Sequence, residues 1–524
     1  MMNQTLPFYD IFAQLNRTPR PSHHEEQVAD FLCRFAEAHG LDYTRDAHNC
    51  IVIRKPASPG HEDALPVVIL NHMDMVCVAE EGHPFDPLHD AIDAYVEPFT
   101  TDDGQTHHWM KAHGTSLGAD NGMGLSMALA ILADKSIEHG PLEVITTTNE
   151  EDGMDGAANL SPDFIRGRHI INLDSEAHDQ ITVGAAGAYI QQARLPYHEI
   201  RAPKDYIYYK VRVRGGLGGH SGVDIVKLRA NAIKILANLL QVSIVHGHVA
   251  LYLVRFEGGQ ASASIPSSAE AMVALPADME QEFKDILIQG SCAVQAQYGV
   301  TDPDTEVLFE PATWHGTILD EESTRCLLAD INAIPTGPLE MHPDMPGTPM
   351  TSNNIGLVRM ITKPTNPSIS SNPLNPSNSS NPSQPHNLTT SQPHFLISTH
   401  SRSFRMEDME LLASKIREIL EFSGAEVETV MNAPAWQEDV QSPFLQLTSD
   451  TFHDLLGFRP TPVAMHFVLE AGYFVQKYPG IQMASIGPRI LEPHSTSERV
   501  ELETCDDIWR VTIELLKRLA NTNL

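Results

Sequence analysis

The sequence contains few cysteines, few basic residues and no long apolar segment. Its six cysteines are spread over 524 residues without any Cys-x-x-Cys pair, so neither a disulfide framework nor a thiolate zinc site is indicated. The absence of a run of about 20 apolar residues excludes a transmembrane helix. The first residues also lack the basic start and apolar core of a secretory signal. We therefore expect a cytoplasmic protein with reduced cysteines and no membrane partner.

The shortage of basic residues makes the chain strongly acidic. Asp and Glu number 68 against 35 Lys and Arg, which gives a formal net charge of -33. Nucleic acids and anionic membrane surfaces repel such a chain, so both are excluded as partners. A length of 524 residues exceeds what one hydrophobic core normally holds and predicts two or more domains.

Four short polar clusters follow apolar runs or lie in a glycine-rich turn beside one. These clusters are Asn71-His72-Met73-Asp74, Gly118-Ala119-Asp120-Asn121-Gly122, Asn149-Glu150-Glu151-Asp152-Gly153 and Asn172-Leu173-Asp174-Ser175-Glu176. One such cluster alone is more often a turn or a solvated loop than a ligand. Together with His494, the four supply the His, Asp and Glu side chains that two divalent ions bridged by one carboxylate require. The combination predicts a two-metal site.

Strand and helix patterns alternate in the first part of the chain. Residues 25–39 and 123–133 have the apolar spacing of helices, and residues 51–54 are typical of a strand. This alternation predicts an α/β fold with a mainly parallel sheet and helices on both faces. Active sites in such sheets lie beyond the carboxyl ends of the strands, where the polar clusters fall.

The pattern changes near residue 203, which indicates a second domain. Strand candidates at 206–213 and 251–256 enclose a helix, as expected for an inserted α+β lid domain. We assign this lid and dimerisation domain to residues 203–403. The catalytic domain then consists of residues 1–202 and 404–524.

Residues 363–394 are rich in Ser, Asn and Pro. Such a composition buries too little apolar surface to offset the entropy lost on ordering. We therefore predict a disordered insertion within the lid domain.

Further motifs support a resemblance to a known family. They are Arg20-Pro21-Ser22-His23-His24-Glu25-Glu26, Ser116-Leu117-Gly118, Gly218-Gly219-His220-Ser221-Gly222, Ser352-Asn353-Asn354, Ser485-Ile486-Gly487-Pro488 and Pro493-His494-Ser495. In order and context these motifs and the four clusters resemble the M20 family of metallopeptidases, and most closely its aminoacyl-histidine (Xaa-His) dipeptidases, the peptidase D subgroup. The resemblance covers residues 16–361 and resumes at 395. The family does not normally have the intervening insertion.

The resemblance implies a pair of divalent ions, zinc in the first place and cobalt or manganese as alternatives. Asp120 would bridge the two ions. His72 and Asp174 would complete one site, and Glu151 and His494 the other. A metal ion bound in this way lowers the pKa of a bound water to about 7.

The resemblance also implies roles for three side chains beside the metals. Glu150 would act as the general base, taking a proton from the attacking water and passing it to the leaving amine. Asp74 would accept the imidazole N–H of His72 and so fix its tautomer. His220 would steady the oxyanion, in some members from a partner subunit, which implies a homodimer formed through the lid. A cis peptide bond is expected after Asp120.

Substrate recognition is the part of the resemblance that this sequence matches least. Arg402 corresponds to a family arginine that grips the free carboxylate of a dipeptide. Glu470 would bind the substrate amino group, and His466 would also contact the substrate. Relatives have Asn where Ala263 stands and Arg where Ser267 stands, so substrate preference is the property most open to change.

We therefore expect a cytosolic di-zinc exopeptidase that cleaves small peptides. The resemblance favours Xaa-His dipeptides such as carnosine. A broader di- or tripeptidase, or an N-acyl amino acid amidohydrolase of the same fold, is the second hypothesis. A third is a metal-binding protein that has lost catalysis. The intact Glu150 argues against this third hypothesis, whereas Ala263 keeps it open.

Overall fold

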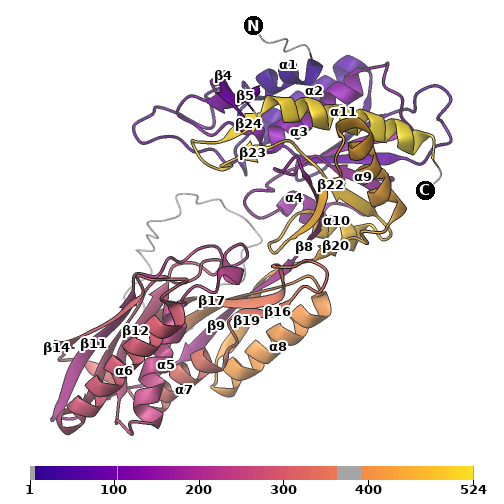
Figure 1. Cartoon of the computed structure of the whole chain (residues 1–524). Coiled ribbons are helices and arrows are strands. Elements are labelled where there is room, and N and C mark those ends of the chain that lie inside the picture. The colour runs from indigo at the N-terminus through magenta and orange to yellow at the C-terminus, as the bar shows by residue number, and fades with distance from the viewer. Residues whose placement is uncertain (1–5, 103, 363–391, 523–524) are drawn as a thin grey trace. The chain divides into compact units, whose positions relative to one another are not determined.

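The computed structural model describes residues 6–102, 104–362 and 392–522, which form two compact units (Figure 1). Unit 1 comprises Met1–Ala185, Trp436–Ala464 and Leu469–Leu524, and unit 2 comprises Ala186–Ala435 and Met465–Val468. Unit 2 is therefore an insertion into unit 1. The segment 465–468 also returns to unit 2 from a later part of the chain.

The helices and strands of unit 1 come from both ends of the chain. Its α-helices are α1 (Pro7–Leu15), α2 (Glu26–His39), α3 (Ala119–Ala133), α4 (Asp155–Asn159), α9 (Pro443–Leu456), α10 (Ala471–Lys477) and α11 (Leu502–Ala520). Its strands are β1 (Asp42–Arg45), β2 (Ile51–Lys55), β3 (Val67–His72), β4 (Ala94–Thr100), β5 (Thr106–Ala112), β6 (Leu142–Thr147), β7 (His169–Asn172), β8 (Gln180–Ala185), β20 (Trp436–Gln437), β21 (Thr461–Met465), β22 (Gln482–Ser485), β23 (Ile490–Leu491) and β24 (Arg499–Glu501).

The large sheet of unit 1 has a parallel centre. Its strand order is β1-β2-β6-β3-β7-β22-β8-β20, with β21 paired to β8. The pairs β6–β3, β3–β7 and β7–β22 are parallel, as expected from the alternating pattern. The pairs towards the two edges are antiparallel. The sheet is therefore mixed: β2, although it lies within the alternating segment, pairs antiparallel with β6, and β22, from a later part of the chain, pairs parallel with β7.

The central strands form because they are apolar on both faces. All six residues of β3 and of β6 are buried, the usual property of parallel strands covered by helices. Val68 and Leu70 pack with Phe474 of α10. The opposite face is covered too, since Ile69 is fully buried and α3 packs against β3 and β6.

Unit 2 contains an antiparallel sheet and four longer helices. Its helices are η1 (Ile225–Lys227), α5 (Ala232–Val245), η2 (Ala277–Met279), α6 (Glu280–Tyr298), α7 (Glu321–Ala333) and α8 (Met406–Phe422). Its strands are β9 (Gly187–Pro196), β10 (Glu199–Arg201), β11 (Tyr206–Arg214), β12 (Tyr252–Gly259), β13 (Ala269–Pro276), β14 (Glu306–Ala312), β15 (Thr317–Leu319), β16 (Gly337–Met341), β17 (Pro349–Ile361), β18 (His394–Ser403) and β19 (Glu426–Ala433). The main sheet has the order β14-β11-β13-β12-β17-β18-β9-β19, with β16 paired to β17.

Unit 2 is larger than the lid domain expected at residues 203–403. Strand β9 lies before that range and β19 after it, yet β9 pairs with both β18 and β19 in the unit 2 sheet. Helix α8 packs against the same three strands. Long-range strand pairing thus moves the boundaries of this compact unit to Ala186 and Ala435. The composition change near residue 203 does not report such pairing.

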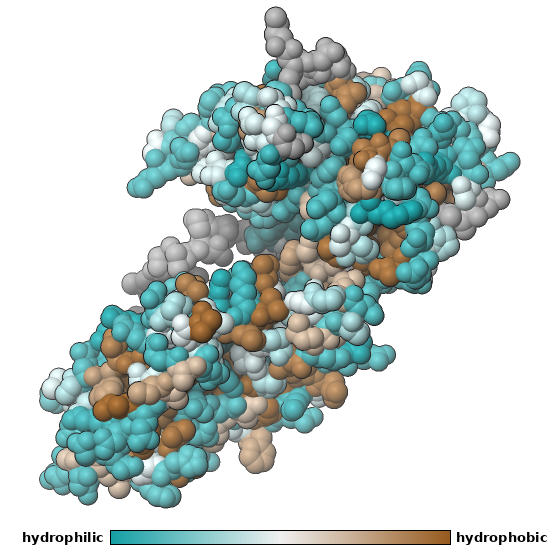
Figure 2. Space-filling model, viewed as in Figure 1, coloured by the Kyte–Doolittle hydropathy of each residue, from teal (hydrophilic) through white to brown (hydrophobic). Residues whose placement is uncertain are grey.

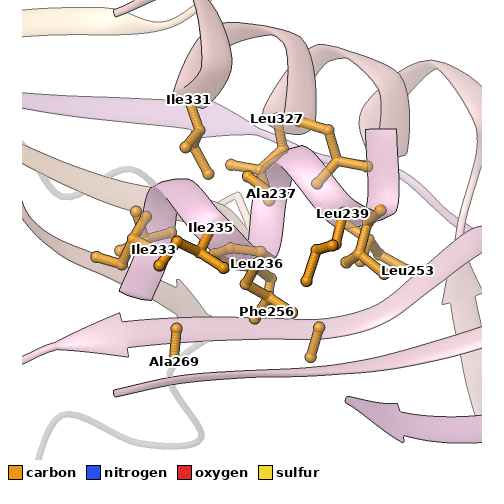
Figure 3. Close-up of a cluster of buried hydrophobic side chains, with 14 of the residues drawn as sticks. Ile233, Ile235, Leu236, Ala237, Leu239, Leu253, Phe256, Ala269, Leu327 and Ile331 are labelled. Carbon is orange, nitrogen blue, oxygen red and sulfur yellow. The ribbon is translucent and has the colours of Figure 1, made fainter. Parts of the chain in front are cut away.

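The core of unit 2 lies between its helices and one face of the sheet. Figure 3 shows α5 lying along β12, with Leu236 directed towards Phe256, and Leu327 and Ile331 of α7 on the other side of α5. Leu236 and Phe256 are fully buried. Residues of α6 and α8 belong to the same buried cluster. This one core accounts for the compactness of the unit.

The surface and the insertion add two findings. Polar residues cover most of the face shown in Figure 2, as the acidic composition suggests. None of the helices in the described part of the chain is both long and apolar enough to cross a membrane. Of the expected disordered insertion, residues 363–391 lie outside the described residues, and β18 begins at His394.

The core of unit 2 gives a stability prediction. Replacing the fully buried Leu236 by Ala should lower the free energy of unfolding by about 2–5 kcal/mol, because it removes apolar contacts and leaves a cavity. Leu411 of α8 is 71% exposed, so Leu411→Ala should change it by less than about 0.5 kcal/mol. Urea unfolding of both variants tests this. Equal losses in the free energy of unfolding for the two variants would contradict the assignment of the core.

Candidate metal centre

Three polar clusters lie at the carboxyl ends of neighbouring parallel strands. His72 is the last residue of β3, Glu150 and Glu151 follow β6, and Asp174 follows β7. Because β3 pairs in parallel with both β6 and β7, these ends meet at one edge of the sheet. The register of the sheet therefore gathers side chains that lie far apart in the sequence.

The first group of metal-binding type contains His72, Asp120 and Asp174. The Nε2 atom of His72 lies 3.2 Å from Oδ1 of Asp120 and 3.2 Å from Oδ1 of Asp174. One donor atom from each residue falls within 4.8 Å of the others. The His72 side chain is 1% exposed, so the group is shielded from water on the side of the imidazole.

The second group contains Asp120, Glu151 and His494. The Nε2 atom of His494 lies 3.3 Å from Oδ2 of Asp120 and 2.9 Å from Oε2 of Glu151. Asp120 is thus common to both groups and turns a different oxygen towards each. A carboxylate with this arrangement can bridge two cations.

The donor set fits a pair of divalent cations. Burial raises the pKa of Asp174 to about 7, the imidazole of His72 opposes this rise, and the charges of Asp120 and Glu151 add to it. Oε1 of Glu151 is buried and has no hydrogen-bond partner among the residues that the structure describes. Cations would offset the repulsion between these carboxylates, and imidazole with carboxylate is a donor set that zinc accepts.

The turn that carries Asp120 departs from helical geometry. Asp120 has φ -82° and ψ 114° although it falls within the bounds of α3. The Asp120–Asn121 peptide bond is cis, as the resemblance implied. Gly118 has φ +68°, a conformation that glycine adopts without steric penalty. The sequence Gly-Ala-Asp-Asn-Gly thus forms a specialised turn before a buried helix.

Asp74 connects the first group to the Glu150–Glu151 turn. Nδ1 of His72 lies 3.2 Å from the backbone oxygen of Asp74 and 3.4 Å from its Oδ1. The same carboxylate accepts hydrogen bonds from the backbone N–H groups of Glu150 (3.1 Å) and Glu151 (3.2 Å) and from Ser22 Oγ (2.8 Å). Asp74 therefore orients the imidazole and both glutamates.

Glu25 provides a further support that sequence reasoning missed. Its Oε1 accepts a hydrogen bond of 2.8 Å from the backbone N–H of Asn149, directly before the two glutamates. Glu25 is 4% exposed, and burial together with the charge of Asp74 raises its pKa to about 7. The only signal in the sequence was its place in the motif that begins at Arg20.

Glu150 has the properties of a proton acceptor. It is 9% exposed, and burial raises the pKa of its carboxyl well above the ordinary value. His72 opposes this shift, while Asp174 and Glu470 add to it. A carboxylate with a raised pKa is a stronger base, which suits proton transfer near neutral pH.

Glu470 also lies in unit 1, directly before α10. It is 1% exposed and accepts a hydrogen bond of 2.7 Å from Thr147 Oγ1, at the end of β6. Burial raises its pKa to about 8. Its Oε1 has no hydrogen-bond partner within the described part of the chain. This oxygen can accept a bond from a ligand.

The remaining expected site residues gather in unit 2. Arg402 is 3% exposed, and its Nη2 lies 3.5 Å from Ser221 Oγ. His466 Nε2 shares a hydrogen bond of 2.7 Å with Ser352 Oγ. A side chain at Gly222 would lie 3.0 Å from the ring of His220 and 3.2 Å from Nε of Arg402. Glycine at 222 thus allows His220 and Arg402 to approach each other.

This unit 2 cluster is basic, and its imidazoles are neutral. Burial, followed by the charge of Arg402, lowers the pKa of His466 to about 3 and also lowers the pKa of His220. Nδ1 of His220 accepts hydrogen bonds from the N–H groups of Gly222 (3.3 Å) and Val223 (3.2 Å). The proton of this neutral ring therefore lies on Nε2, which makes Nε2 a donor.

His400 belongs to the same cluster, and sequence reasoning missed it. It precedes Arg402 by two residues on β18, so both side chains point to the same face. His400 is 4% exposed, and neither of its ring nitrogens has a hydrogen-bond partner among residues 6–102, 104–362 and 392–522. In the sequence, the only sign of this role is that His400 lies two residues before Arg402 in a predicted strand, where alternate side chains share a face.

Comparison with known proteins places this geometry in a family. Residues 68–521 match the model of peptidase family M20/M25/M40. The chain belongs to this family. It is 33% identical over 516 residues to the cytosol non-specific dipeptidase of Escherichia coli K12, covering 98% of this chain and 97% of that protein.

Solved structures agree with the M20 assignment. The aminoacylhistidine dipeptidase from Vibrio alginolyticus matches with a TM-score of 0.83 and 28% identity, covering 98% of this chain and 97% of that one. A tripeptidase from Staphylococcus aureus has a TM-score of 0.54 and 15% identity over 98% of both chains, which shows a shared fold.

Family membership confirms the predicted resemblance and the fold class. The chain is a metallopeptidase of the M20 family, a hydrolase with an α/β unit and an inserted α+β unit. The two groups that share Asp120 are candidate donors for metal-dependent chemistry.

The sharing of Asp120 predicts a pattern of metal loss. His72→Ala and His494→Ala should each reduce the metal content from two equivalents to about one, because each removes a donor from one group. Asp120→Ala should reduce it to near zero. Elemental analysis after gel filtration gives the content, with His89→Ala, at a 75% exposed side chain, as control. Two equivalents retained by Asp120→Ala would contradict a bridging carboxylate.

Proposed function

We propose that this protein is a dipeptidase that uses two divalent cations and hydrolyses Xaa-His dipeptides. The observation that carries this proposal is the sharing of Asp120 by two donor groups, with the buried Glu150 next to one of the ligands. Such a centre is suited to attack of water on a carbonyl. The names of the E. coli and Vibrio relatives support dipeptides as substrates, and the Vibrio name supports the Xaa-His class.

We propose distinct roles for the residues around the reacting carbonyl. Cations held by the five ligands would polarise this carbonyl and acidify water. The carboxylate of Glu150 accepts the proton of the attacking water and delivers it to the nitrogen of the leaving amine. Asp74 holds Nδ1–H of His72, so Nε2 is the free ligand atom. His220 donates its Nε2–H to the developing oxyanion.

We propose that two buried charged groups recognise the ends of the peptide. Arg402 binds the free carboxylate, since Nε of its buried guanidinium has no hydrogen-bond partner among the described residues, and a buried charge without a partner is costly. Glu470 binds the free amino group through its unpartnered Oε1. His466, held by Ser352, is placed beside Arg402 as a further substrate contact.

Two substrate ranges are candidates, one restricted to Xaa-His dipeptides and one covering dipeptides more broadly. The Vibrio structure, with a TM-score of 0.83, is named as an aminoacylhistidine dipeptidase, which favours Xaa-His substrates. The E. coli relative, at 33% identity, is named as a non-specific dipeptidase, which favours a broader range. A free amine and a free carboxylate are required under both.

We propose zinc as the native metal, because imidazole and carboxylate ligands match its preferences. Cobalt and manganese are alternatives. We also propose a cytoplasmic location, since the E. coli relative is named as cytosolic. A homodimer formed through unit 2 stays a prediction.

The first test is a substrate panel with metal-reconstituted protein. We expect hydrolysis of β-Ala-His and Gly-His, slower hydrolysis of Leu-Gly, and none of a tripeptide or an N-acetyl amino acid. Glu150→Gln should lower kcat about 10²- to 10⁴-fold, because it removes the general base. Its metal content should stay at two equivalents, since Glu150 belongs to neither donor group.

The outcomes of this panel separate the hypotheses. Comparable kcat/KM for Leu-Gly and the histidine dipeptides would establish the broader dipeptidase. Hydrolysis of the N-acetyl amino acid would establish an amidohydrolase. No hydrolysis of any compound by protein with two bound metals would overturn the proposal.

The proposed carboxylate contact predicts a second kinetic result. Arg402→Ala should lower kcat/KM for a free dipeptide by about 30-fold or more, which corresponds to about 2 kcal/mol. The same variant should hydrolyse the C-terminal amide of that dipeptide as the wild type does. Arg405→Ala is the matched control, because Arg405 is 49% exposed and pairs with Glu340 and Asp408 at the surface. An equal loss on free acid and amide would argue against carboxylate binding.

A further inference from the structure

Glu498 holds the turn that carries the shared ligand Asp120. Its Oε2 accepts the N–H groups of Leu117 (2.8 Å) and Gly118 (2.9 Å). Its Oε1 accepts those of Ala119 (2.8 Å) and Asp120 (3.4 Å). Four consecutive backbone N–H groups thus converge on one carboxylate, which is 3% exposed.

Arg20 holds the same turn from its carbonyl side. Its Nη2 donates to the carbonyl of Gly118 (2.6 Å), and its Nη1 donates to the carbonyls of Met73 (3.3 Å) and Asp74 (3.1 Å). Arg20 is 1% exposed. One guanidinium therefore connects the Asp120 turn to the segment that directly follows His72.

The two contacts meet on a single peptide unit. The carbonyl of Gly118 and the N–H of Ala119 belong to the same planar group, and Arg20 binds the first while Glu498 binds the second. A Cβ atom at Gly118 or at Gly122 would lie 2.5 Å from Nη2 of Arg20. Glycine at both positions is what allows the guanidinium to come this close.

Neither Arg20 nor Glu498 supplies an atom to the two donor groups. Burying Arg20 and Glu498 nevertheless costs free energy, because each is a charged group removed from water. Glu498 lies four residues after His494, so one loop contributes both a ligand and the support of another ligand. A rotation of the held peptide would displace both oxygens of Asp120 and disturb both groups together.

We propose that Arg20 and Glu498 are positioning residues that set the affinity of both metal sites through the backbone of Asp120. This inference rests on the proposed two-metal function. It distinguishes the pair from residues such as His72 or His494, whose loss affects one site. Groups that orient metal ligands typically change metal affinity by about 10- to 100-fold when altered.

Glu143, at the end of β6 away from the ligands, provides a matched control. Glu143 is also 3% exposed, accepts the N–H groups of Arg166 (2.6 Å) and Gly167 (2.9 Å), and pairs with Arg54 (3.1 Å). It lies at the start of β6, whereas the ligands follow the end of that strand. Glu143→Gln therefore reports the effect of neutralising a buried, backbone-binding glutamate away from the metals.

The test compares Zn²⁺ affinity in competition with a chelating dye, for full-length metal-free protein. Glu498→Gln should weaken binding of both equivalents about 10-fold or more, because an amide cannot accept four N–H groups. Arg20→Lys should weaken both in the same way, since the single Nζ of lysine cannot take the two separate positions from which Nη1 and Nη2 of Arg20 donate. Glu143→Gln should bind as the wild type does. Circular dichroism and the thermal midpoint of the metal-free proteins show whether each variant is folded. If Glu498→Gln does not fold, the Zn²⁺ affinity of Arg20→Lys tests the proposal.

Two results would overturn the inference. One is affinity of a folded Glu498→Gln or Arg20→Lys variant within about 3-fold of wild type, or weakened at one equivalent only. The other is an equal loss in Glu143→Gln, which would make the effect one of general stability. A wild-type chain that binds fewer than two equivalents would instead overturn the two-metal function itself. The measurement needs no substrate, so the two failures are distinguishable.

Discussion

The repulsion between three carboxylates with little exposure to solvent is the constraint on which the site of unit 1 depends. Asp120, Glu151 and Asp174 come from three separate segments: Glu151 and Asp174 follow strands of the sheet, and Asp120 lies in the turn at the start of α3. Burial and the charges of neighbouring carboxylates raise the pKa of Asp174 to about 7 and also raise that of Glu151, so the folded chain holds these two groups at an energetic cost. At Asp120 burial is outweighed by His494 and His72, which lower the pKa of its carboxyl. Binding of cations to this form of the protein would offset that cost, and metal would thereby stabilise the fold.

The supports around the ligands follow from this constraint. Asp74, Glu25 and Glu498 all use carboxylates to bind backbone N–H groups of the ligand turns, at 2.8–3.4 Å. A backbone held in this way cannot relax to separate the repelling side chains. The supporting residues therefore add further negative charge to the unit but increase its rigidity. Arg20 is the buried cation that partly balances them.

Local sequence patterns pointed to the candidate ligands, and the family resemblance to the support Asp74, but neither pointed to Glu25 and Glu498 as supports. His72, Glu151 and Asp174 follow apolar strands, and this pattern is local, so the α/β centre and the strand-end positions could be predicted. Glu498 acts on residues almost four hundred positions earlier, at a sequence separation of 378–381. A contact between residues so far apart in the sequence produces no periodic pattern from which it could be predicted. The same reason explains why the boundaries of unit 2, set by the pairing of β9 with β18 and β19, differ from the composition change.

The departures at Ala263 and Ser267 affect side chains and leave the His220 loop supported. The backbone oxygen of Ala263 accepts the N–H of Ser221 (2.7 Å), and that of Ser267 accepts the N–H of Gly216 (3.2 Å). Any residue type provides these carbonyls, so the loop that presents His220 keeps its anchors without the family's Asn and Arg side chains. The missing side chains change what surrounds the substrate, and in this chain the buried polar groups near Arg402 include His400, whose ring nitrogens are unpartnered within the described residues. The two departures therefore bear on the proposed recognition of substrate, while the residues proposed to perform hydrolysis are all present in the chain.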